Sequence, residues 1–417
     1  MSQVQATLDH LFRRESGRIV AYLTRFFGPD HLDLAESAVQ DALIKAIQTW
    51  PIQGIPDNPA AWILQVAKNA AIDSIRGGKF LAHDSVESLE ATMADEGIAE
   101  EFVNEIRDDQ LKLMFICCHP ILPREARIAL TLKTVCGFSV PEIAKAFLAK
   151  EETIAQRLVR AKQKIAESQV KFEVPNPDEL ESRLQSVLEV LYLVFNEGYS
   201  ATKGTSLIRR DLCEEAIFRT QVLAEHPICR RPQIYALLAL MHFQVSRFNS
   251  RLDSEGELLL LEEQDRSLWD QEHIGLGLKL LELSAEGEEL TDYHLQAGIA
   301  SCHATAKSFE DTQWERILSY YDLLLIKDHS PIVALNRAVA IAMIHGPAAG
   351  LDEIELIKDL PPLKSYYLLP ATMAELNRRL GKMAEAKALY QKALALVGTE
   401  PEKRLIEKRI RACEAEA

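Results

Sequence analysis

The sequence lacks any run of apolar residues close to the ~20 that a membrane-spanning helix needs. Its first residues, MSQVQATLDHLFRRES, lack the apolar core of a signal peptide. The cysteines are an odd and scattered set, at positions 117, 118, 136, 213, 229, 302 and 413. We therefore expect a cytoplasmic protein, without a membrane partner, whose cysteines are buried thiols rather than disulfides.

Patterns typical of metal binding or catalysis are also missing from the sequence. Cys117-Cys118-His119 contains metal-ligand side chains, but a zinc site needs a second ligand pair at a set spacing and none is evident. No nucleophile and base stand at a recognisable spacing either. We therefore predict no metal, no cofactor and no catalytic residue.

The chain has no overall excess of basic residues, since its net charge is −15, and this argues against indiscriminate nucleic-acid binding. The charge is unevenly distributed. Residues 81–110 hold 1 Lys or Arg against 10 Asp and Glu, whereas residues 111–170 hold 10 against 5, a net charge of +5. Residues 171–417 hold 28 against 39, a net charge of −11. A basic module beside acidic ones suits a regulated DNA-binding protein.

The basic module contains a pair of short predicted helices, FSVPEIAKAFLAKEETIAQRLVRAKQKI. Ser139 and Glu142 form a predicted capping box for the first helix. The second is expected to begin at Thr153 and to bury Ile154, Leu158, Ala161 and Ile165. Four cations and no acid lie between Arg157 and Lys164. This pattern predicts a helix-turn-helix, with a helical hairpin bearing a solvated cationic face as the alternative.

Three amphipathic helices are predicted before this module. The second, Asp33 to Trp50, is expected to bury Ile47 with its small apolar residues and to expose Gln40, Asp41 and Lys45. A loop, PIQGIPDNP, follows. Asn58 is then the predicted cap of a third helix. This helix carries a polar stripe of Gln65, Asn69 and Arg76, with Asp73 at its edge and Lys68 to one side.

Every segment beyond Pro175-Asn176-Pro177 also has a helical pattern, so we predict an all-α fold. The expected helices are Leu180–Phe195, Asp211–Glu225, Pro232–Arg247, Gln264–Glu282 and Leu290–Ser308. The segment from Gly381 through Tyr390 to Leu396 is typical of the second half of a tetratricopeptide repeat. The segment from Asn336 to Gly346 is similar to a degenerate copy of the same repeat, which Pro347–Gly350 interrupts. We therefore expect stacked helical hairpins from about residue 290 to 415.

The order of these motifs resembles a bacterial RNA polymerase sigma factor of the extracytoplasmic-function type. The residues that carry the resemblance are AVQDALIKA, AAWILQVAKNAAIDSIRG and, after the acidic linker, RLVRAKQKI. DDQLKLMFICCHPIL and VLYLVFNEGYSAT are similar to the subgroup with a long C-terminal extension, called ECF42-like or SigJ-like. The expected domains are region 2 (1–80), acidic linker (81–110), region 4 (111–172), helical extension (178–285) and repeats (286–417).

The resemblance implies three surfaces and two partners, core RNA polymerase and promoter DNA. Gln40, Asp41 and Lys45 would bind the clamp coiled coil, while region 4 would contact the flap. The residues implied to open and read the −10 element are Gln65, Lys68, Asn69, Asp73 and Arg76, with the loop 51–59. Those implied to bind the −35 element are Thr153, Gln156, Arg157 and Arg160. Arg160, Lys162 and Lys164 are expected to contact phosphates.

The extension holds several conspicuous polar and aromatic residues: Asn196, Glu197, Gly198, Tyr199, Gln264, Asp265, Arg266, Trp269, His303, Asp311, Trp314, Asn336 and Arg337. We interpret most of them as helix caps and ion pairs, with a ligand pocket as the alternative. The resemblance implies that the extension regulates the sigma core, through a regulator that the sequence does not identify. Two alternative functions remain: a helix-turn-helix regulator that acts without polymerase, and an enzyme in the C-terminal half.

Overall fold

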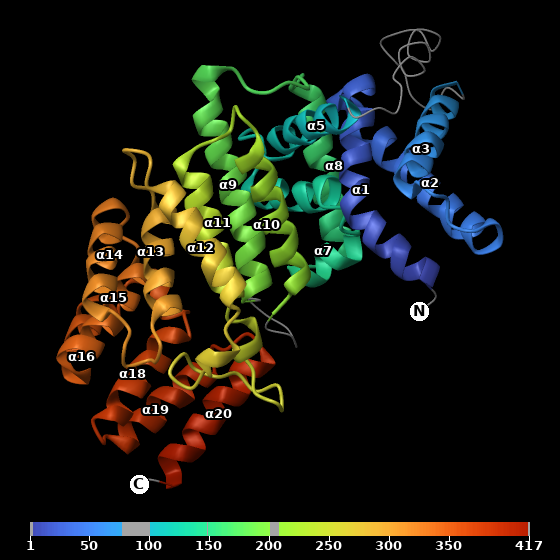
Figure 1. The fold of residues 1–417 in the computed structure, drawn as a ribbon. Coiled ribbons are helices and arrows are strands. Elements are labelled where there is room, and N and C mark those ends of the chain that lie inside the picture. Colours follow the sequence, from blue (N-terminus) through green and yellow to red (C-terminus); the bar gives the residue numbers. More distant parts are fainter. Residues whose placement is uncertain (1–2, 77–100, 148, 201–207, 416–417) are drawn as a thin grey trace. The chain divides into compact units, whose positions relative to one another are not determined.

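The computed structural model describes residues 3–76, 101–147, 149–200 and 208–415 (Figure 1). These residues form helices and connecting loops. They also contain an isolated antiparallel β-bridge between Leu252 and Leu258. The predicted all-α fold class is confirmed. The chain divides into two compact units, residues 1–193 and 194–417. Across the described ranges, no helix is both long enough and apolar enough to cross a membrane.

The described residues of the first unit form seven α-helices, a 3-10 turn η1 (Pro29–His31), a π-helical segment and the beginning of another α-helix. They are α1 (Gln3–Phe27), α2 (Leu32–Gln53), α3 (Pro59–Arg76), α5 (Glu101–Cys117), α6 (Arg124–Leu130), the π-helical η2 (Thr131–Val135), α7 (Val140–Ala146), α8 (Glu151–Glu167) and the first part of α9 (Pro177–Tyr199). Of the predicted acidic linker, residues 81–100 lie outside the described residues.

Helices α2 and α3 pack together around Trp50, whose ring lies 5.5 Å from that of Trp62. Asn58 caps α3 as predicted, because its side chain accepts a hydrogen bond from the Ala61 amide at 3.1 Å. The expectation that Ile47 is buried is wrong: it is 49% exposed. Position 47 lies about 60° around the helix from Trp50, at the edge of the buried face.

Helix α2 also extends beyond the predicted end at Trp50. Pro51 lies inside the last turn, where a missing amide costs only one helical hydrogen bond. Gly54, with φ of 89°, ends the helix and donates its amide to the Trp50 carbonyl at 3.0 Å. Three residues of the predicted loop, Pro51 to Gln53, are therefore helical.

The helix-turn-helix is formed by α7 and α8. The capping box is confirmed, since the Glu142 amide donates to Ser139 Oγ and Glu142 Oε2 accepts from the Ser139 amide. Helix α8 begins at Glu151, two residues before the predicted start. Its predicted inner face is confirmed, with Ile154, Leu158, Ala161 and Ile165 all buried.

Helix α1 contacts η2 so closely that only glycine fits at position 17. A Cβ atom there would overlap the Val135 carbonyl oxygen. This contact brings the N-terminal helices against the segment that supports the helix-turn-helix. Both therefore belong to one compact unit.

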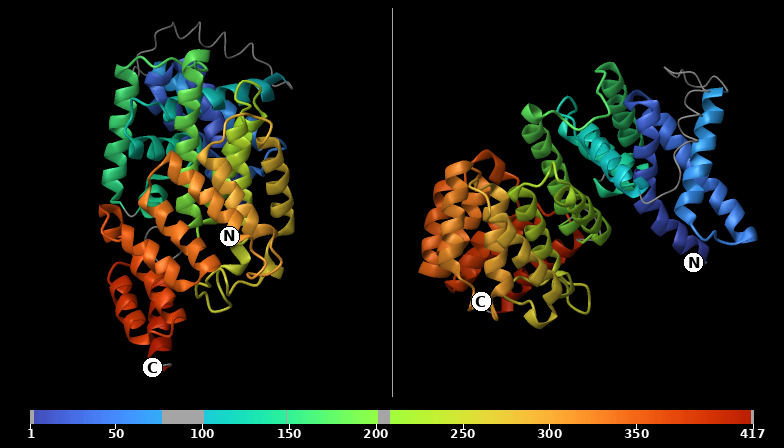
Figure 2. Two further views of the ribbon diagram at one scale, coloured as in Figure 1. Left: turned by 90° about the vertical axis from the view of Figure 1, so that its left-hand side faces the viewer. Right: turned by 45° about the horizontal axis from the view of Figure 1, so that its top comes forward.

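The second unit is a succession of helices in which sequence neighbours pack against each other (Figure 2). Its helices are the end of α9, α10 (Arg210–Glu225), α11 (Pro232–Val245), α12 (Gln271–Ser284), α13 (Asp292–Thr305), α14 (Trp314–Lys327), α15 (Pro331–His345), α16 (Pro347–Ile357), α17 (Pro361–Lys364), α18 (Leu368–Arg379), α19 (Met383–Leu394) and α20 (Glu400–Ala415), with 3-10 turns η3 (Phe248–Ser250) and η4 (Arg266–Leu268). The predicted helix Gln264–Glu282 starts seven residues late, at Gln271, because the Asp270 side chain caps the Glu272 and His273 amides.

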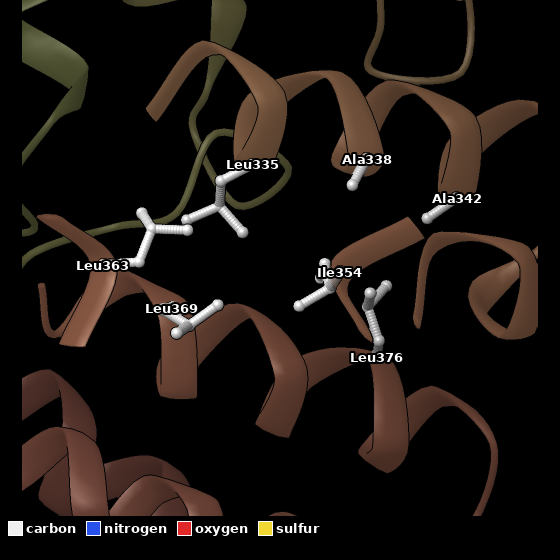
Figure 3. Packing of buried hydrophobic residues seen from close by; sticks show 7 residues of the cluster. All are labelled: Leu335, Ala338, Ala342, Ile354, Leu363, Leu369 and Leu376. Carbon is white, nitrogen blue, oxygen red and sulfur yellow. The ribbon is translucent and has the colours of Figure 1, made fainter. Parts of the chain in front are cut away.

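The last helices of the second unit form hairpins with small residues at their contacts. Gly350 lets α16 approach α15, since a Cβ there would lie 2.5 Å from that of Ala342. Figure 3 shows the core beneath this contact, with Ile354 facing the leucines of α15 and α18. In the next hairpin Tyr390 packs among buried alanines of α18 and α19. The stacked hairpins agree with the predicted repeats, while their identity as tetratricopeptide repeats stays a prediction.

Candidate nucleic-acid interface

An open groove of about 300 Å³ runs between α6 and the exposed side of α8. Five of the six residues predicted to contact the −35 element line it; Lys162 does not. The groove is lined by Leu122, Pro123, Glu125, Ala126, Thr153, Gln156, Arg157, Arg160, Ala161 and Lys164. Residues predicted separately from helical spacing are thus brought to one concave surface by α6, which lies beside α8.

The groove is electropositive. Arg160 and Lys164 are exposed and Arg157 is half-buried. No carboxylate in the described part of the chain forms an ion pair with any of these three, although the exposed Glu125 lies among the lining residues. Cations left without an intramolecular partner are available to phosphate or to base edges. The arrangement fits the duplex contact that the sequence predicts for this helix.

Lys162 is held away from this groove. Its ammonium group lies 2.6 Å from Asp33 Oδ1 and 2.6 Å from Glu36 Oε2, both on α2. Burial alone would lower the pKa of Lys162, but the two carboxylates outweigh it and raise the pKa above its usual value. The predicted phosphate contact of Lys162 would therefore require this ion pair to open.

Glu36 joins the N-terminal helices to the helix-turn-helix. Its Oε1 accepts a hydrogen bond from Thr134 Oγ1 at 2.5 Å, while Oε2 pairs with Lys162. The residue is 9% exposed. A buried carboxylate requires such partners, because desolvation of an unpaired charge is costly. We call Asp33, Glu36, Thr134 and Lys162 the α2–α8 clasp.

The polar stripe predicted on α3 lies on its exposed face with one exception. Gln65, Asn69, Asp73 and Arg76 are exposed, and Gln65 Nε2 donates to Asn69 Oδ1 at 3.2 Å. Lys68 is only 9% exposed, and its ammonium group lies 5.2 Å from the ring centroid of Tyr22. Burial of the lysine stem with a cation–π contact explains this position. Four of the five predicted −10 residues are thus accessible in this structure and Lys68 is not.

The predicted polymerase-binding residues share an exposed face of α2. Gln40, Asp41 and Lys45 are exposed, and two apolar residues lie among them, Ile44 at 53% and Ile47 at 49% exposure. The sequence analysis missed Ile44 and Ile47 as surface residues. Their position among the polar residues of the helical pattern is the feature of the sequence that could have identified them as surface residues. A face that exposes apolar residues among polar ones is typical of a surface that binds another protein.

Val159 is a second residue that the sequence analysis missed. It is 63% exposed on α8, between Gln156 and Arg160. Its exposed apolar side chain is available for contact with a partner. Its place among polar residues is the feature of the sequence that could have identified it as a surface residue.

The Cys117-Cys118-His119 cluster has a structural environment. All seven cysteines are buried, and none of them forms a disulfide bond. Burial raises the pKa of Cys118 to about 11 and lowers the pKa of His119 to about 4. His119 Nδ1 accepts the Ile121 amide at 3.1 Å. In the ranges that the structure describes, no three His, Cys, Asp or Glu side chains gather as metal ligands would.

Comparison with known proteins gives matches to three protein families. Sigma-70 region 2 matches residues 11–80 and Sigma-70 region 4 matches residues 112–165. A family of unknown function (DUF6596) matches residues 183–285. The chain is also 38% identical over 379 residues to an uncharacterized protein of Rhizobium meliloti (strain 1021), an alignment that covers 90% of this chain and 88% of that protein.

Proposed function

We propose that the chain directs transcription initiation at promoters with −10 and −35 elements. The premise is that it belongs to one family with the Rhizobium meliloti protein and carries regions 2 and 4 of an RNA polymerase sigma factor. It belongs, in this proposal, to the extracytoplasmic-function type with a long C-terminal extension. Its partners are core RNA polymerase and promoter DNA, and it acts in the cytoplasm, where both are found.

The observation that carries the proposal is the groove along α8. It collects Thr153, Gln156, Arg157, Arg160 and Lys164 on one surface, with three cations that pair with no described carboxylate. In this assignment the side chains of the first turns of α8 read bases of the −35 element, and the later cations contact phosphates. The exposed stripe of α3 opens and reads the −10 element, with an unpaired base bound on its exposed edge.

The clamp coiled coil of the polymerase binds the α2 face in this proposal, and region 4 contacts the flap. The test is co-purification with core polymerase. We expect the double variant Asp41→Lys with Lys45→Asp to weaken polymerase binding at least about tenfold, which corresponds to roughly 1.4 kcal/mol. Its thermal midpoint should stay near that of the wild type, because both side chains are exposed. The exposed pair Lys279 and Glu282 on α12, reversed in the same way, is the matched control. Unchanged polymerase affinity of the α2 variant would exclude this face.

The same experiment separates the alternatives. A helix-turn-helix regulator that acts alone would bind DNA without polymerase and would need a dimer face for two half-sites. An enzyme in the C-terminal half would turn over a substrate regardless of polymerase. Sigma-70 regions 2 and 4 are those of a non-enzymatic transcription factor. Retention on core polymerase supports the sigma assignment and opposes the regulator.

The extension has a regulatory role in this proposal. Residues 171–417 carry a net charge of −11, whereas the helix-turn-helix module at residues 111–170 carries +5. An acidic surface can compete with phosphate for such cations, and this competition weakens as salt increases. We infer that the extension limits DNA binding by the free protein until polymerase or a further regulator intervenes.

A further inference from the structure

Three arginines in the second compact unit lie close together without an acidic partner. Arg247 and Arg251 flank η3, and Arg266 begins η4. The guanidinium carbons of Arg247 and Arg266 lie 5.3 Å and 4.7 Å from the ring centroid of Trp269. Arg251 lies over Tyr199 at 4.0 Å. Throughout the described ranges no aspartate or glutamate forms an ion pair with any of the three.

Two of these arginines have evident structural roles. Arg266 donates to the His303 and Ala306 carbonyls at 2.5 Å and 2.9 Å and so caps the end of α13. Arg251 donates to the Tyr199 carbonyl at the end of α9. Positive side chains at helix C-termini satisfy free carbonyls and complement the helix dipole. The role of Arg266 agrees with the predicted interpretation of this residue as a helix cap or an ion-pair partner.

Arg247 is different, because the fold uses only part of its guanidinium group. Its Nε donates to Gln264 Oε1 at 3.2 Å, and its two terminal nitrogens have no acceptor among the described residues. Burial lowers the pKa of Arg247 below its usual value, and Arg251 lowers it further against the opposing effect of Tyr199. Arg247 is partly exposed, so these two terminal nitrogens are accessible to an anion from solvent.

Further donors around this arginine are also unused. Trp269 is only 3% exposed, and its Nε1 has no hydrogen-bond partner among the described residues. The same holds for His303 Nδ1 and Arg266 Nε, both of them buried atoms. Burial, assisted by Arg247 and Arg266, lowers the pKa of His303 to about 3. Two acids, Glu310 and Asp311, act on Arg266 from exposed positions and form an ion pair with none of these atoms.

We propose that Arg247, Trp269 and His303 form a binding site for the phosphate group of a small molecule. The planar fork of a guanidinium group matches two phosphate oxygens, and the indole N–H and imidazole supply further donors. A dianionic phosphate is favoured over a carboxylate because three guanidinium groups lie around the site and none of them forms an ion pair with a described carboxylate. The site gives the extension a ligand of its own, independent of the proposed role in transcription.

The test is thermal unfolding of the full chain titrated with inorganic phosphate, with sodium chloride added to hold the ionic strength constant. We expect a saturable rise in the midpoint, since a ligand that binds only the folded state stabilises it. The variant Arg247→Gln should lose the saturable rise. Trp269→Phe keeps an aromatic ring but removes the donor, and should bind phosphate roughly tenfold more weakly.

The exposed Arg230 provides the matched control, because Arg230→Gln removes one charge and should leave phosphate binding unchanged. Phosphate also stabilises proteins by general exclusion from their surface, and this unsaturable effect should be equal in every variant. Should Arg247→Gln not fold, Arg247→Lys decides, since it keeps the charge and loses the fork and is expected to bind phosphate more weakly. An absent saturable rise in the wild type, an equal rise in the Arg247 variant, or an equal response to acetate would each overturn the proposal.

Discussion

Lys162 illustrates how a residue can be assigned correctly to a helix face and still have different neighbours from those expected. The sequence predicts it on the cationic side of α8, among Arg160 and Lys164. In the structure its long side chain reaches Asp33 and Glu36 on α2, and only 13% of it is exposed. At the residue scale, the structure therefore separates groove cations, which pair with no described carboxylate, from a cation that holds two helices together.

The two carboxylates of the α2–α8 clasp should differ in importance for stability. The Asp33 side chain is 64% exposed, whereas that of Glu36 is 10% exposed and also accepts from Thr134. We expect Glu36→Gln to lower the free energy of unfolding by about 1–3 kcal/mol, since it weakens a buried charged pair. Asp33→Asn should cost less than about 1 kcal/mol, as exposed pairs do. Urea unfolding of both variants measures the difference, and equal losses would contradict the clasp.

The groove residues should divide into those that read bases and those that bind phosphates. Arg157 lies in the second turn of α8 and Lys164 near its end. We expect Arg157→Ala to change the preference at one or two −35 positions by about 1–3 kcal/mol. Lys164→Ala should weaken all promoters about equally and reduce the salt dependence of binding. Affinities for a set of promoter variants at several salt concentrations test this. A uniform loss for both substitutions would refute the division.

At the scale of elements, local sequence patterns determine where helices begin and end, but not always their full length. Ser139 caps α7 as its capping box predicts, while α2 continues through Pro51 to a glycine stop at Gly54. In the last hairpin, α18 and α19 are joined at Gly381, with φ of 75°. Glu375 on α18 then links the two helices by accepting a hydrogen bond from Tyr390 Oη at 2.8 Å.

This hydrogen bond makes the hairpin sensitive to acid. Burial would raise the pKa of Glu375, but hydrogen bonds from Arg378, Tyr390 and Arg379 together lower it below 4.5. A carboxyl whose folded pKa is depressed contributes stability above its unfolded pKa, and that stability is lost as the pH falls through the folded pKa. We expect Glu375→Gln to cost about 1 kcal/mol at neutral pH and progressively less below pH ~4.5.

Thermal midpoints of the wild type and Glu375→Gln between pH 7 and pH 3 measure this effect. The exposed Glu288, in the loop after α12, supplies the control, and Glu288→Gln should leave the midpoint unchanged at every pH. A difference between the wild type and Glu375→Gln that stayed constant down to pH 3 would show that the carboxylate charge is not the cause.

At the scale of the whole molecule, the chain divides within α9 rather than at the prolines before it. The two compact units meet at Leu193 and Val194, whereas the sequence predicts the extension to begin at residue 178. The first part of α9 has partners in the first unit. Arg183 donates to the Phe115 carbonyl at 2.8 Å, and Glu189 pairs with Arg124 and Arg127. A truncation that removes the extension should therefore retain residues up to 193.

Removal of the extension tests its proposed regulatory role. We expect a chain of residues 1–193 to transcribe more actively in vitro than the full chain, because an acidic competitor for the groove cations is lost. A chain of residues 1–175 should be less stable than this one, because it lacks the contacts of Arg183 and Glu189. Transcription lost from a folded 1–193 chain would show instead that the extension is required. Equal activity would make it an independent binding module.

The sequence by itself determined the all-α fold, the capping box of α7, the buried face of α8 and most residues of its exposed face. These depend on interactions within a few residues, which spacing along a helix reveals directly. Only the tertiary structure decided the burial of Lys68, the pairing of Lys162 with Asp33 across 129 positions, and the gathering of Arg247, Trp269 and His303. The physical reason is that the partners of a long side chain depend on which helices pack beside its own. A local sequence pattern does not contain this information when the helices are distant in the chain.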